Sequence, residues 1–472
     1  MNGAELTSLG VGALADRLAR REVSSEEVVR ACLERSERLN PTLAAFITVC
    51  REGALRAARR ADRELARGRS RGPLHGVPFA VKDAFWTRAI RTTNGSRLFE
   101  TFVPTEDATV VARLRAAGAI LLGKLNMMEV GFGPTLRPLF GVPRNPWNTE
   151  RTTGGSSSGS ASAVVAGLAP FTLGADTGGS IRLPAALCGV VGLKPTRGRV
   201  SRHGLMGTSA MLDCAGPLAR SASDCAIALA AIAGHDRKDP MTTRAAVDNY
   251  VAAIGQGLAG VRIGLVRESM ESGVLDPEVR RLVADAAVAL GGAGARVEEI
   301  SIPLIDHASA LYVAIAEPEA AARFRPYLLT RSHDIDVLPR RRLLTASLIP
   351  ASLIARARRL GDRLQAQVDE ALRVVDVLVS PTTPTAAPPI ATASRVTSKD
   401  DAWMTVVAGR SLFTNPFNIT GHPALSVPCG FTADGLPVGL QVVGRYNREA
   451  DVLRVAAAYE AVTPWHDRLP EV

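Results

Sequence analysis

The sequence predicts an α/β fold, built as one large domain around a buried sheet. Short apolar runs of strand length alternate with longer amphipathic runs of helical period, as in folds whose sheet is covered by helices. The 472 residues would suffice for two or three average domains. No linker-like segment and no internal repeat divides them, so residues 1–472 are expected to form one domain.

The first half of the chain is expected to begin with helices, which fill the first seventy residues, and to continue into the first strands. Ser24 and Glu27 form a capping box ahead of an amphipathic run. A second helical run stops before Gly68. The expected elements after the first helix are a helix over 52–67, a strand over 76–83, a helix over 109–117 and a strand over 120–122.

The second half continues the alternation after a Gly- and Ser-rich segment at 149–199. Helices are expected over 223–233, 277–290, 343–375 and 450–461, and strands over 261–266, 375–379, 424–428 and 438–443.

Composition excludes several classes of protein. The net charge of +10 comes mostly from arginines spread over amphipathic stretches, with no aromatic interleaving, so a solvated surface is favoured over a nucleic-acid interface. The six cysteines show no metal-binding or C-x-x-C spacing and are expected to be reduced packing residues of a cytoplasmic protein. The charged N-terminus is not a secretory signal, and no apolar run is long enough to span a membrane.

Two Gly-rich loops carry serines, at 154–160 and at 176–180. Each precedes an expected helix, whose free N–H groups and positive dipole end point back at the loop. Such a turn can stabilise the oxyanion that forms when a carbonyl is attacked. Two glycine turns with capping serines would leave the same pattern, so the loops alone do not decide between the two.

The group that would activate a serine is not a histidine of either loop, since none is adjacent in sequence. The 155–159 segment matches G-x-S-x-G, but the nucleophile elbow needs an apolar strand before it, and 148–153 is expected to form none. No serine stands three residues before a lysine, which removes the S-x-x-K pattern.

Lys82 remains as the candidate base, because it ends an apolar strand. Burial disfavours the ammonium form, so a buried lysine can accept a proton near pH 7. Taken alone, such a lysine is more often the ion-pair partner of a carboxylate such as Asp83.

These motifs resemble those of the amidase signature family. The resemblance rests on 76–83, 154–160 and 176–185, with Ser156 and Ser180 standing 24 residues apart. It continues through 189–196, 381–384 and 415–439, covers about residues 6–461, and is most specific in a signature core at about 74–220.

The resemblance implies a mixed central β-sheet flanked by helices and a Ser-Ser-Lys triad. Ser180 would be the nucleophile, Ser156 the bridging serine beside a cis peptide bond, and Lys82 the base. Backbone amides of Thr177, Gly178 and Gly179 would form the oxyanion hole, and Asp176 and Arg182 would brace the loop. Neither a metal nor an organic cofactor is implied. The expected partner is a small-molecule amide, without nucleic acid or membrane, and a homodimer is left open.

One residue departs from the family pattern. Ser158 stands where the family often has glycine. If that position requires a positive φ, the serine would strain the loop.

The function expected first is hydrolysis of carboxamides to acid and amine or ammonia by a stand-alone amidase. The segment 126–140 is expected to reach the mouth of the site, with Met127, Met128 and Phe132 as substrate contacts and a preference for apolar amides over glutamine. The resemblance implies that substrate residues also come from a second variable segment, 308–329.

The alternative is the glutaminase component, or A subunit, of a glutamyl-tRNA(Gln) amidotransferase, which works with a partner protein. Two features argue against it: 343–358 lacks the tyrosine-rich stretch of those proteins, and Ser411 replaces an acidic residue. A catalytically silent binding protein is disfavoured because all three triad positions are filled.

Overall fold

The computed structural model describes residues 2–392 and 411–472. Within them, eleven strands form one sheet in the order β1-β3-β2-β6-β8-β7-β12-β13-β11-β9-β10. The strands of this sheet are β1 (Phe46–Val49), β2 (Pro78–Lys82), β3 (Ile120–Leu125), β6 (Phe171–Asp176), β7 (Val191–Lys194), β8 (Cys214–Ala219), β9 (Arg262–Val266), β10 (Arg296–Ile300), β11 (Val377–Pro381), β12 (Ala424–Phe431) and β13 (Pro437–Gly444). Two more, β4 (Arg144–Asn145) and β5 (Asn148–Thr152), pair with each other outside it.

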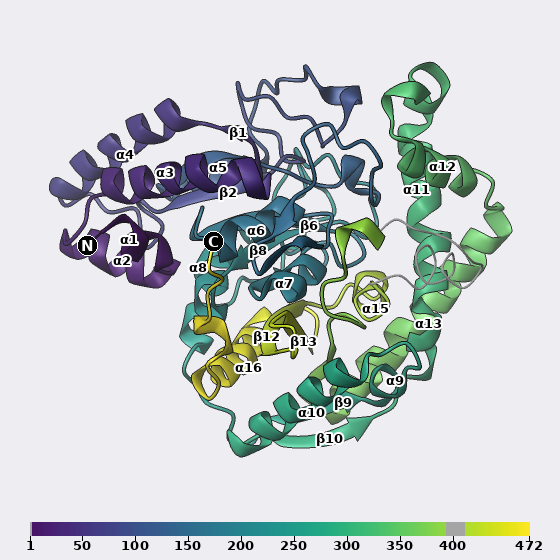
Figure 1. The fold of residues 1–472 in the computed structure, drawn as a ribbon. Coiled ribbons are helices and arrows are strands. Elements are labelled where there is room, and N and C mark those ends of the chain that lie inside the picture. Colours follow the sequence, from purple (N-terminus) through teal and green to yellow (C-terminus); the bar gives the residue numbers. More distant parts are fainter. Residues whose placement is uncertain (1, 393–410) are drawn as a thin grey trace.

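Helices cover the sheet and also lie at both ends of the molecule (Figure 1). Figure 1 shows α1 to α4 at one end and α11 to α13 at the other. The helices are α1 (Gly3–Ser8), α2 (Val11–Arg20), α3 (Ser25–Leu43), α4 (Arg51–Ala66), α5 (Thr109–Ala116), α6 (Ser158–Val165), α7 (Arg182–Cys188), α8 (Ala222–Ile232), α9 (Arg267–Glu271), α10 (Pro277–Gly292), α11 (Ala308–Thr330), α12 (Val337–Ala346), α13 (Ala351–Val374), α15 (Asn415–Ile419) and α16 (Glu449–Ala461). No helix in the described ranges is both long and apolar enough to cross a membrane.

The pairing makes the sheet mixed, which confirms the expected fold class. Strand β2 runs parallel to β3 and β6, and β11 runs parallel to β9, while β6, β8, β7, β12 and β13 pair antiparallel. One continuous sheet therefore joins strands from both halves of the chain, which supports the expectation of one domain.

Most expected elements are present, and two expectations are wrong. The first seventy residues include β1, a four-residue edge strand that is too short to give a periodic signal. The 343–375 stretch is two helices, because Pro350 caps α13 after α12 has ended. Residues 148–152 form a polar strand, β5, outside the central sheet, so no apolar strand precedes the serine loop, as expected.

The alternation of side chains along β2 sets which face Lys82 occupies. Phe79 and Val81 belong to the main core, whereas Ala80 packs with residues of α3, α4 and α6. Since residues two apart on a strand share a face, Lys82 lies on the side of Ala80. Because β2 and β6 are parallel neighbours, the loop after β6 emerges at the same sheet edge as Lys82.

Gly159, in the first turn of α6, is predicted to tolerate no side chain. A Cβ there would overlap the carbonyl oxygen of Ala45 and lie 2.7 Å from that of Asn126. We expect Gly159→Ala to lower the free energy of unfolding by about 1–3 kcal/mol, the usual effect of overpacking. Urea unfolding measures this.

The matched control is Gly291→Ala in α10, where nothing lies within 4 Å of the added Cβ. That variant should be neutral or stabilising by up to about 1 kcal/mol, since alanine favours a helix over glycine. Equal effects in the two variants would contradict the packing argument.

Candidate active site

Lys82 ends β2 in a buried position with 2% of its surface exposed. Its Nζ donates a hydrogen bond to the Ser156 hydroxyl over 2.7 Å and lies 3.5 Å from the Ala175 carbonyl oxygen. The possibility that Lys82 pairs with Asp83 is wrong, because Asp83 pairs with Lys124 at 3.1 Å. In the described ranges, Lys82 forms no ion pair with any carboxylate.

Burial without a close countercharge changes the acidity of this lysine. Desolvation lowers the pKa of Lys82 to about 7, although the charges of Asp213 and Asp176 act in the opposite direction. A substantial fraction of Lys82 is therefore neutral near pH 7 and able to take a proton from Ser156.

Ser156 follows a cis peptide bond between Gly155 and Ser156, as the resemblance implies. Its carbonyl accepts from Met128 N at 3.2 Å. The next residue, Ser157, donates its N–H to the carbonyl of Ser180 at 3.2 Å, and this bond joins the two serine loops.

Ser158 does not strain the loop. It is the first residue of α6 and does not have a positive φ, and its hydroxyl donates to the Gly154 carbonyl at 2.9 Å. The condition under which serine would be unfavourable at this position is therefore not met.

Ser180 lies between β6 and α7 and is half-buried, so its hydroxyl is accessible. The hydrogen bonds of the described residues include Lys82 to Ser156 but none from the Ser180 hydroxyl. The structure thus brings Lys82 and Ser156 into direct contact and ties Ser180 to them through the backbone.

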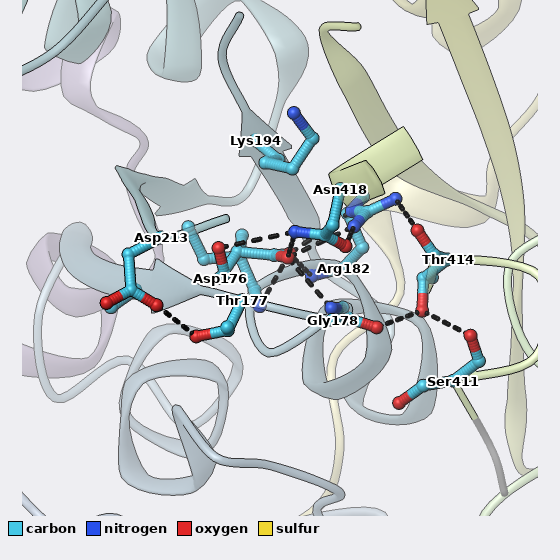
Figure 2. A network of polar contacts seen from close by, with 12 residues as sticks. Asp176, Thr177, Gly178, Arg182, Lys194, Asp213, Ser411, Thr414 and Asn418 are labelled. Atoms are coloured by element: carbon cyan, nitrogen blue, oxygen red, sulfur yellow. Dashed lines mark hydrogen bonds and ion pairs between the residues drawn. The ribbon is translucent and has the colours of Figure 1, made fainter. Parts of the chain in front are cut away.

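An ion pair braces the loop that carries Ser180 (Figure 2). Arg182 donates to both carboxylate oxygens of Asp176, at 3.0 and 3.1 Å, and both side chains are fully buried. Burial alone would raise the pKa of Asp176, but the Arg182 guanidinium holds it well below its usual range. Asp176 also accepts from the backbone N–H groups of Gly179 and Ile181, at 2.8 and 3.0 Å.

The expected oxyanion hole needs one correction. The N–H of Gly179 is already donated to Asp176, because Thr414 holds the preceding carbonyl, of Gly178, in the opposite direction at 2.7 Å. Over the described part of the chain, the N–H groups of Thr177, Gly178 and Ser180 have no acceptor. These three are therefore the free donors of the loop. Figure 2 shows the Thr177 hydroxyl bound to Asp213, at 2.6 Å.

The three expected substrate contacts have different surroundings. Met127 packs in the main core with 5% exposure. Met128 lies against Gly155, beside Ser156, so a Cβ on that glycine would overlap its thioether. Phe132 is buried in another apolar cluster, and the guanidinium of Arg342 lies 4.5 Å from its ring centre.

The expected substrate segment 308–329 forms most of α11 and supplies Tyr312 and Glu317, whereas sequence reasoning missed Arg342 of α12. Tyr312 of α11 lies against Gly178, where an added Cβ would be 2.8 Å from its ring. Arg342 of α12 donates to the Phe132 carbonyl at 3.1 Å and to Glu317 at 2.8 Å. No local motif marks these residues, since they lie more than 150 positions from Ser156.

No group of three or more histidine, cysteine, aspartate or glutamate side chains converges to hold a metal ion within residues 2–392 and 411–472. The polar groups around Ser180 are instead hydroxyls, backbone amides and one lysine.

Comparisons with known proteins agree with this arrangement. A family model described as Amidase matches residues 27–453. The A subunit of the glutamyl-tRNA(Gln) amidotransferase from Thermosynechococcus vestitus is 41% identical, over 97% of this chain and 98% of that protein.

Two solved structures are similar over almost their whole length. One comes from a vestigial protein complex that reveals the evolutionary origins of an s-triazine catabolic enzyme, with a TM-score of 0.89 at 33% identity over 96% of this chain and 98% of that one. The other is the native peptide amidase of Stenotrophomonas maltophilia, with a TM-score of 0.83 at 34% identity over 96% of both chains.

Turnover of a carboxamide is predicted to depend on the free-base form of Lys82. Because burial lowers its pKa to about 7, kcat/KM should rise with pH through about 7 and then level off. Lys82→Met should reduce kcat/KM about 10²- to 10⁴-fold, the range for loss of a general base. If kcat/KM of Lys82→Met kept the same pH dependence, Lys82 would not be the base.

Asp213→Asn tests the electrostatic origin of that profile. The Asp213 charge raises the pKa of Lys82 against the larger effect of burial. Its removal should therefore move the acidic limb of the kcat/KM profile to lower pH. Asp306→Asn is the distant control and should leave the limb in place, since Asp306 does not act on Lys82. Equal shifts in both variants would contradict the argument.

Proposed function

The chain belongs to the amidase family, and we propose that it hydrolyses a carboxamide through an acyl-enzyme on Ser180. The observation that carries this proposal is the hydrogen bond of 2.7 Å between buried Lys82 and Ser156. It provides a base of suitable pKa and a hydroxyl that can pass a proton between that base and the neighbouring serine loop.

In the first half of the reaction, neutral Lys82 takes the proton of Ser156 while Ser156 takes the proton of Ser180. The Ser180 oxygen then bonds to the amide carbon, and the C=O electrons move to the carbonyl oxygen. The free N–H groups of Thr177, Gly178 and Ser180 donate to that oxyanion.

The tetrahedral intermediate collapses when the C–N bond breaks. The leaving nitrogen takes a proton from Ser156, which is replenished from the Lys82 ammonium, and an ester of Ser180 remains. Water then attacks the ester by the same relay, releases the acid and restores Ser180.

Two candidates differ in the amide that is used. The whole-length similarity to the glutaminase component of an amidotransferase favours glutamine as the amide and a partner protein as the user of ammonia. The likeness to a peptide amidase supports a stand-alone enzyme, at lower identity. On balance the comparisons favour the amidotransferase function over the stand-alone amidase that was expected first.

The side chains that lie near the two serine loops bear on the same choice, and they are treated as one wall of the site. Besides Met128 and Phe132, it carries the Arg342–Glu317 pair, so it is less apolar than the 126–140 segment suggested. Guanidinium groups bind carboxylates well. Because Glu317 already pairs with Arg342, a substrate carboxylate, such as that of glutamine, would have to share this guanidinium with Glu317.

The acyl-enzyme is testable directly. Hydroxylamine added during turnover should divert product to a hydroxamate, and a sulfonyl fluoride should add its mass at Ser180. Ser180→Ala should reduce turnover by at least about 10³-fold, as for removal of an acyl-transfer nucleophile. Ser160→Ala, in α6 near the site, is the control and should retain most activity. Near wild-type turnover in Ser180→Ala would refute the mechanism.

The choice of amide is tested by a substrate series on the purified chain. We expect kcat/KM for glutamine to exceed that for acetamide and hexanamide, and Arg342→Met to reduce the value for glutamine more than that for hexanamide. If affinity instead climbs along the alkyl series by about 0.8 kcal/mol per methylene, the apolar preference is right and the glutamine proposal is wrong.

A further inference from the structure

A second cavity, of about 460 Å³, lies at the opposite end of β3 from the reacting side chains. It is bounded by α4, by the segment containing Arg71 and His75, and by the start of β3 at Ile120 and Leu121. Strand β3 pairs in parallel with β2, so that Ile120 is beside Pro78 and Leu125 is beside Lys82. The cavity is therefore at the amino ends of these strands, whereas Lys82 is at the carboxyl end.

The lining of this cavity is strongly basic. Its described residues include four arginines from three segments, Arg56 and Arg60 of α4, Arg71, and Arg115 of α5, against one carboxylate, Glu64. The remaining carboxylates that pair with these arginines, Glu52 and Asp107, lie outside the lining. The whole 51–71 segment carries eight arginines and three acidic residues, so the surrounding surface adds to the positive potential.

The single carboxylate of the lining is already engaged. Glu64 lies 2.7 Å from the Arg71 guanidinium and 3.1 Å from Nε2 of His75. His75 is buried, and its Nδ1 accepts from the backbone N–H of Arg71 at 3.1 Å. Arg60 is 4.0 Å from Glu64 and 65% exposed, so its guanidinium is free to turn to a ligand.

The floor of the cavity is apolar. Ala57, Ala61, Ile90 and the two β3 residues form it. Gly53 adds an open stretch of the α4 wall, since no atom lies within 4 Å of a Cβ placed there. A ligand that fills the cavity would thus contact apolar surface with one part and guanidinium groups with another.

From this combination we propose that the cavity binds a phosphorylated small molecule, with a di- or polyphosphate held by Arg60 and Arg115 and an apolar body on the floor. The volume lies in the range of small-molecule sites. Guanidinium forks match phosphate oxygens in bidentate geometry. The four lining arginines have three carboxylate partners, Glu52, Glu64 and Asp107, but only Glu64 belongs to the lining, and a diphosphate would offer the exposed guanidinium groups several negative charges in a compact group.

The test is isothermal titration calorimetry of the full chain at fixed ionic strength, with ADP, inorganic pyrophosphate, adenosine and citrate as probes. ADP should bind more tightly than pyrophosphate, because only ADP also contacts the floor, and adenosine should not bind. Citrate serves as a tricarboxylate control and should bind more weakly than ADP. If citrate or adenosine bound as tightly as ADP, the phosphate site would be refuted. The absence of a binding signal with every probe would also refute it.

Substitutions locate the binding. Arg60→Gln and Arg115→Gln should each weaken ADP about tenfold, as expected for loss of a charged hydrogen bond. Arg63→Gln is the matched control, because Arg63 is exposed on the same helix but does not line the cavity. It should change the affinity less than about twofold, since solvent and salt screen it. Equal losses in Arg60→Gln and Arg63→Gln would indicate diffuse surface charge and overturn the proposal.

Discussion

The chemistry of the molecule depends on one amino group that is buried without a carboxylate beside it. Removing Lys82 from water would be costly for the ammonium, so the protein lowers its pKa to about 7. The contrast with Lys124 is direct, since that lysine is equally buried but pairs with Asp83. Burial lowers the pKa of both lysines, but only Lys124 has a carboxylate in contact that favours its charged form.

The loop that carries Ser180 is held in place by residues from the other end of the chain. Asp176 and Arg182 fix the loop between β6 and α7, and Arg182 reaches on to Asn418 and Gln441. These partners come from α15 and β13, more than 230 residues later in the chain. Figure 2 shows how Thr414 and Asn418 meet the loop from this distant segment. The shape of the oxyanion loop is therefore a property of the whole sheet and does not arise from a local glycine motif.

The sequence was sufficient for what is encoded locally. Features determined by neighbouring residues are all present: the capping box of α3, the apolar strand that ends at Lys82, and the helices after both serine loops. The roles of Gly179 and Asp83 were not predictable, because each residue has several possible partners and only the folded structure shows which partner it contacts. Asp176 accepts a hydrogen bond from the N–H of Gly179, and Lys124 forms an ion pair with Asp83. Such competition is decided in three dimensions, where several donors meet one acceptor.

The substrate is the property that is hardest to predict from the sequence, because it too depends on contacts between residues that are distant in the chain. The proposed relay lies on β2, the loop before α6 and the loop after β6, which any amide would use in the same way. Near it, Arg342 of α12 donates to the Phe132 carbonyl and to Glu317 of α11, and Tyr312 of α11 lies against Gly178. We therefore expect replacement of residues on these two helices to change the amide that is accepted without disturbing Lys82. Such a separation is compatible with the similarity of this chain both to a peptide amidase and to a glutamyl-tRNA(Gln) amidotransferase subunit.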